Sequence, residues 1–82
     1  MKTQTYTVLF EYFKDDTAEG FNVVVPALPE IVTWGRTLEE AKANAVEALS
    51  CVLESMAEEG EPFPLDVEAP QVVHVEKMPV TL

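Results

Sequence analysis

Four glutamates recur at spacings that fit a single face of an α-helix. At 100° per residue they fall within an arc of about 40°, and they are Glu40, Glu47, Glu54 and Glu58. The positions where lysines would brace them hold Asn44 and Cys51, and Glu54 and Glu58 form a like-charged i,i+4 pair. We call this set the acidic stripe and predict that it docks a basic partner, which would relieve the repulsion and speed encounter. The alternative is a face that serves only solubility.

The remaining chemically capable residues do not form a catalytic pattern. A metal-dependent nuclease needs carboxylates that project from strands into one pocket, and the strand interiors here contain only Glu11, while Asp15, Asp16 and Asp66 lie in expected turns or extended segments. The single histidine, His74, cannot supply a multi-histidine metal site and has no nucleophile placed near it by a motif. We therefore predict a non-enzymatic protein without a metal or cofactor.

The numbers and positions of the cysteine and the glycines exclude an internal disulfide and a glycine-rich phosphate-binding loop. The single Cys51 cannot form an internal disulfide and has no cationic neighbour in sequence that would make it reactive. Gly20, Gly35 and Gly60 are too far apart to form a phosphate-binding loop.

Length and charge narrow the class of protein further. A chain of 82 residues is one domain, here residues 1–82, and 48% hydrophobic residues with 24% charged residues are typical of a folded globular protein. The net charge of −10 repels nucleic-acid phosphates and anionic membranes, so we expect neither as a direct partner. No apolar run has the length of a signal peptide or a membrane span, which predicts a cytoplasmic protein.

Hydrophobic alternation and turn residues predict the order β-β-β-α-β. The strands are expected at residues 5–13, 21–25 and 31–34, with a last strand around Val72, Val73 and Val75. Thr37, followed by glutamate three residues on, is typical of a helix N-cap, and Gly60 is a natural stop. The predicted fold class is α+β: one three- to four-stranded, largely antiparallel sheet with a long amphipathic helix on one face.

A single helix covers only one face of such a sheet. The helix is expected to bury a wide apolar arc, and Trp34 is expected to pack in the core, with an interface anchor as the alternative. The opposite face of the strands carries Leu9, Phe13, Val24 and Ile31. We predict that these residues are covered in a homodimer or higher homo-oligomer, because so short a chain buries little surface by itself. The rival cover is the 62–70 segment folding back.

The motifs between Gly20 and Leu53 resemble those of the HicB family. In that family a strand ends in a proline-x-leucine-proline turn, a short strand ends in glycine-x-threonine, and a Glu-Glu-Ala helix start follows. The matching residues are Pro26, Leu28, Pro29, Gly35, Thr37, Glu39, Glu40 and Ala41. A later glycine-x-proline-x-proline stretch, residues 60–64, resembles the segment after the helix in that family. The resemblance covers roughly residues 5–67.

The resemblance implies a partial RNase H-like fold and an antitoxin. HicB proteins neutralise HicA, a small basic toxin that degrades mRNA through a histidine, so the implied partner is a HicA-like toxin. The alternative is a stand-alone oligomeric scaffold or small-ligand-binding protein that has lost its toxin. Two departures stand out: Glu30 and Ile31 follow Pro29 where the family has glycine, so the turn must avoid positive φ or be strained. In addition, the chain ends at Leu82 without the family's C-terminal DNA-binding domain, so operator binding is not expected.

Overall fold

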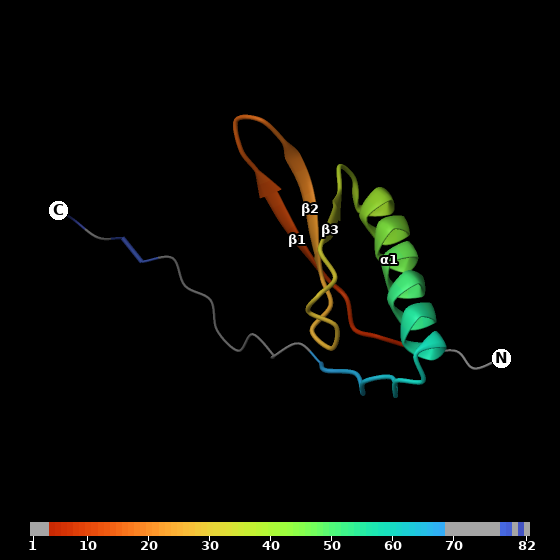
Figure 1. The fold of residues 1–82 in the computed structure, drawn as a ribbon. Coiled ribbons are helices and arrows are strands. Elements are labelled where there is room, and N and C mark those ends of the chain that lie inside the picture. The colour runs from red at the N-terminus through yellow and green to blue at the C-terminus, as the bar shows by residue number, and fades with distance from the viewer. Residues whose placement is uncertain (1–3, 69–77, 80, 82) are drawn as a thin grey trace.

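Three antiparallel strands and one helix form the body of the protein. The computed structural model describes residues 4–68, 78–79 and 81, and its elements are β1 (Leu9–Lys14), β2 (Glu19–Val24), β3 (Thr33–Gly35) and α1 (Leu38–Glu58). The sheet order is β1-β2-β3, and α1 packs along one side of it, against β3 and β2 (Figure 1). The predicted α+β class and the order β-β-β-α are confirmed. The expected last strand and His74 lie outside the described residues.

The β1–β2 hairpin is held in register by its turn. Leu9 pairs with Val24 and Lys14 with Glu19 at the two ends of the ladder. In the turn, Oδ1 of Asp15 accepts hydrogen bonds of 2.8 Å from the backbone N–H and the hydroxyl of Thr17 and from the N–H of Ala18. These bonds lower the pKa of the Asp15 carboxyl below its ordinary value, the Thr17 backbone bond contributing most.

The proline-rich turn after β2 shifts the third strand along the chain. The N–H of Leu28 donates to the carbonyl of Val25 at 3.0 Å, and the N–H of Ile31 donates to that of Leu28 at 3.1 Å. Because the turn engages Ile31, β3 begins only at Thr33 and ends at Gly35, later than the expected 31–34. No non-glycine residue of the described chain has a positive φ, so this turn does without the family's glycine and without the strain that a left-handed residue would bring.

The helix begins and ends close to the residues that the sequence predicts, the N-cap Thr37 and the stop at Gly60. Thr37 is the N-cap, and its hydroxyl oxygen accepts a hydrogen bond of 3.1 Å from the N–H of Glu40. At the other end Glu59 is the C-cap, and Gly60 has a φ of 71°, the left-handed conformation that glycine adopts without cost. Val46, expected in the buried arc, is instead 64% exposed because it lies at the edge of that arc.

The hydrophobic core lies between α1 and the inner face of the sheet. Its buried residues among those described are Val23, Val25, Leu28, Ile31, Ala41 and Ala45, with partly buried side chains from β1, β2 and α1 around them. The helix comes close to β3 at Gly35, where a Cβ would collide with the backbone of Ala41. Side by side with this contact, the Asn44 side-chain amide donates a 2.8 Å hydrogen bond to the backbone carbonyl of Trp34. No helix among the described residues is both long enough and apolar enough to cross a membrane.

Candidate functional site

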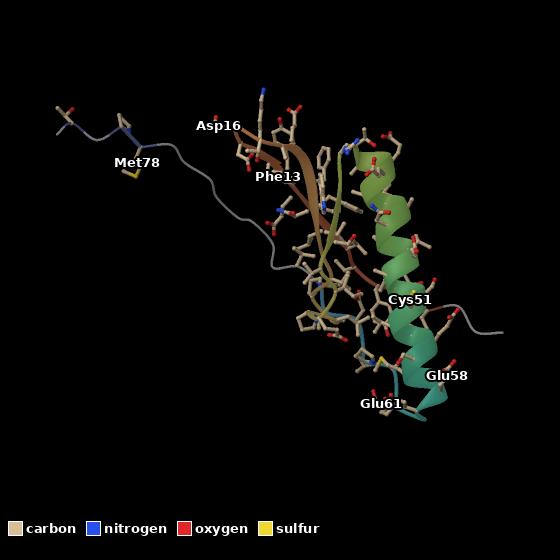
Figure 2. The ribbon with its side chains drawn as sticks, turned by 45° about the horizontal axis from the view of Figure 1, so that its top comes forward. Phe13, Asp16, Cys51, Glu58, Glu61 and Met78 are labelled. Carbon is tan, nitrogen blue, oxygen red and sulfur yellow. The ribbon has the colours of Figure 1, made fainter. Side chains whose placement is uncertain are left out.

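The acidic stripe lies on the solvent side of α1. All four of its members, Glu40, Glu47, Glu54 and Glu58, are exposed, while Ala41 and Ala45 on the opposite side of the helix are buried. Figure 2 shows Glu58 on the side of the helix away from the sheet. Cys51 is a free, exposed cysteine, as its position on the helix predicts. The helix therefore brings the four carboxylates onto one open surface.

At the C-terminal end of α1 the acidic side chains are unfavourable for the helix dipole. A helix C-terminus carries a partial negative charge that favours basic side chains, yet the last turn of α1 contains no basic residue. Two further acids follow the stripe there. A hydrogen bond between the carboxyls of Glu59 and Glu61, together with their repulsion, raises the pKa of Glu61. Figure 2 shows Glu58 and Glu61 near the end of the helix, so acidic side chains and the negative end of the helix lie in the same region.

The second surface of interest is the sheet face turned away from α1, which we call the outer face. It carries Leu9, Phe13 and Val24, all half-buried and none part of the core cluster, which agrees with the side of the sheet expected for them. The rings of Phe13 and Trp34 lie with centroids 5.9 Å apart and planes inclined at 58°. Val32, next to this pair along the chain, is 91% exposed.

Two sequence expectations about these faces are wrong. Ile31, expected on the outer face, is 6% exposed and belongs to the core, because the turn after Pro29 directs it between the sheet and the helix. Trp34, expected in the core, is 43% exposed and lies outside the core cluster. Since Asn22 and Trp34 are paired residues of the ladder, the tryptophan shares the face of exposed Asn22 and not that of buried Val23.

An open pocket of about 380 Å³ lies between this face and the proline turn. Its lining includes Glu11 and Asn22 together with the valines and prolines of the β2–β3 connection. Glu11 is its only charged lining residue. The described residues contain no group of three or more histidine, cysteine or acidic side chains that could hold a metal ion.

One contact between distant parts of the chain had no signal in the sequence. The carboxylate of Asp66 accepts hydrogen bonds from the backbone N–H of Thr7 at 2.8 Å and from its hydroxyl at 2.7 Å. The hydroxyl of Tyr6 donates to the carbonyl of Pro64 at 2.8 Å. These bonds fasten the segment after the helix beside the start of the sheet, and 59 residues separate Thr7 from Asp66, so no local spacing could reveal them.

Comparisons with known proteins found a matching family model and a similar curated protein. A family model described as "HicB_like antitoxin of bacterial toxin-antitoxin system" matches residues 6–79. The chain is also 40% identical over 70 residues to UPF0150 protein Ta0767 of Thermoplasma acidophilum, a match that covers 84% of this chain and 96% of that protein. No solved structure matches the chain significantly.

Proposed function

Because the chain belongs to the family of HicB-like antitoxins of bacterial toxin–antitoxin systems, we propose that it binds and masks a small, basic, HicA-like toxin that degrades mRNA. The chain itself performs no catalysis. It covers the toxin's RNA-binding surface with the acidic stripe and acts in the cytoplasm, where the mRNA is. The observation that carries this proposal is the stripe of exposed, unbraced glutamates on one side of α1.

Electrostatics supports a basic partner at this surface. A net charge of −10 attracts a cationic protein over a distance and raises the rate of encounter. The C-terminal part of the stripe destabilises the helix in the free protein, since Glu58 lies at the negative end of the helix and repels Glu54. Lysines or arginines of a toxin would neutralise both effects. A protein that cuts RNA must bind phosphates, so an acidic protein surface competes for the same basic side chains.

The test compares two variants with the same change in net charge. In the first, Glu40, Glu47, Glu54 and Glu58 are changed to glutamine. In the second, four exposed acids elsewhere are neutralised: Glu11, Asp16, Glu30 and Glu68. The protein encoded beside this chain is the candidate toxin, and calorimetry measures its binding while an RNA-cleavage assay measures its inhibition.

We expect the stripe variant to lose about tenfold or more in affinity, the sum of several exposed ion pairs of about 0.2–1 kcal/mol each. The control variant should bind with little change. Equal losses in both variants would show that only the overall charge matters. Absence of any complex between the unaltered proteins would refute the proposal itself.

A further inference from the structure

The segment after the helix holds three apolar side chains in solvent. We call residues 62–68 the strap, and Figure 1 shows it leaving the end of α1 as an extended stretch. Within the strap Phe63 is 37% exposed, Leu65 89% and Val67 49%, and none of them belongs to the core cluster. They are alternate residues, and alternate side chains of an extended chain point the same way. We call these three residues the apolar strip.

The strap is held in place by the two residues that alternate with the apolar strip. The carboxylate of Asp66 accepts two hydrogen bonds from Thr7, and the carbonyl of Pro64 accepts one from the hydroxyl of Tyr6. Pro62 and Pro64 also fix their own φ and restrict the residues before them. A segment that is already ordered loses little conformational freedom on binding. The strap therefore presents the apolar strip to solvent in a preorganised form.

The neighbours of the apolar strip along the chain are acidic. No lysine or arginine occurs between Lys42 and Lys77 in the sequence, whereas exposed Glu61 precedes the strip and exposed Glu68 follows it. Figure 2 shows Glu61 near Glu58, the last member of the acidic stripe, at the end of the helix. The acidic stripe and the apolar strip are thus continuous there. A partner that covers both must offer basic side chains beside apolar ones.

Exposed charges alone are a poor source of affinity. Ion pairs that stay in contact with water contribute little each, and they speed encounter more than they slow dissociation. Apolar area removed from water adds free energy in proportion to that area, and the side chains that hold a complex together fill desolvated pockets near its centre. The acidic stripe therefore accounts for fast approach of a basic toxin, and a long-lived complex needs an apolar contact beside it.

We propose that the apolar strip is the anchor of the toxin complex, with Leu65 entering an apolar depression of a protein whose lysines or arginines meet the acidic stripe. This inference rests on the proposed function and adds the second half of the partner's chemistry, an apolar site edged by basic residues. A second copy of the chain is a poor occupant of the strip, because it carries a charge of −10 itself and would bring the same acids to the same place.

Rate constants separate the anchor from the acidic stripe. Surface plasmon resonance measures association and dissociation of the protein encoded beside this chain, at low and at high salt. Leu65→Ala should raise the dissociation rate constant about fivefold or more at both salt concentrations, because salt screens charges and not apolar contacts. The variant with four glutamines in the stripe should instead lose association rate at low salt. Val32→Ala truncates a valine that is 91% exposed in the β2–β3 connection and, as the control, should change neither rate constant.

The outcomes distinguish this inference from the proposed function. Circular dichroism checks that each variant folds, as expected for changes to exposed side chains. If the unaltered chain forms no complex, the proposed function and the anchor both fail. If a complex forms and Leu65→Ala dissociates no faster than Val32→Ala, only the anchor fails. A Leu65→Ala chain whose own mass in sedimentation falls while its dissociation from the toxin is unchanged would assign the strip to contacts between copies and overturn the proposal.

Discussion

Phe13 and Trp34 pack their rings 5.9 Å apart across Gly20, the residue that separates them on the middle strand of the sheet. A Cβ on Gly20 would lie 3.2 Å from Cε3 of Trp34 and would collide with the carbonyl of Gly35. Glycine at this position therefore lets an aromatic side chain from each of the edge strands, β1 and β3, meet above the central strand β2. The contact shapes the outer face, and it can be tested by filling the space.

Gly20→Ala should destabilise the fold by about 1–3 kcal/mol, the usual cost of overpacking a close contact. Urea unfolding followed by tryptophan fluorescence measures this loss, because the ring of Trp34 lies against the site of the change. An alanine variant that unfolds at the same urea concentration as the unaltered chain would contradict the packing described here.

Removing the N-cap hydroxyl of Thr37 should lower the free energy of unfolding, and a variant that keeps a hydroxyl there should retain it. Thr37→Ala removes the oxygen that accepts the hydrogen bond from the Glu40 N–H, and should cost about 1 kcal/mol. Thr37→Ser keeps the oxygen and serves as the control. Equal midpoints of urea unfolding for the alanine and serine variants would show that the cap contributes nothing.

Reversing one charge of the acidic stripe should stabilise the free protein and weaken its complex. Glu58→Lys places a cation four residues after Glu54 and near the negative end of α1, which together contribute a few tenths to about 1 kcal/mol. Glu30→Lys, an exposed change in a loop, is the control. Urea unfolding measures stability and calorimetry measures toxin binding. A variant that gains no stability would show that the stripe imposes no electrostatic cost.

The bond between Asp66 and Thr7 should break at low pH. Hydrogen bonds from the Thr7 N–H, the larger cause, and from the Thr7 hydroxyl lower the pKa of the Asp66 carboxyl below its ordinary value of 3.8. Folding depresses this pKa, so the stabilisation is complete above the ordinary value and is lost as pH falls through the depressed one.

An NMR titration can follow the carboxyl carbon of Asp66 and the amide of Thr7 together. Both should shift in the same transition, and that shift of the amide should vanish in Asp66→Asn while it persists in Asp16→Asn. Titration of Asp66 at or above its ordinary pKa would contradict the bonds.

Local signals in the sequence determined the hairpin, the proline turn, the helix cap and the acidic stripe. Each depends on residues within a few positions of one another: Thr37 caps the amide three residues on, and the stripe follows from the periodicity of one helix. The family motifs share this local character, which is why they were readable before the fold was known.

Only the tertiary structure decided which face of the sheet each residue after Pro29 occupies. A strand shows its two faces alternately, so the register in which β3 pairs with β2 decides which of its residues face the helix. Trp34 pairs with Asn22 and therefore lies on the outer face, whereas Ile31 is buried in the core. The hydrogen bonds between Asp66 and Thr7 could not be predicted from the sequence either, because they join two segments that only folding brings together. Interactions between neighbouring residues determine the strands, turns and helix, so they can be predicted from the sequence. Which side of the sheet a residue occupies, and which distant segments are hydrogen-bonded, depend on contacts between residues far apart in the chain.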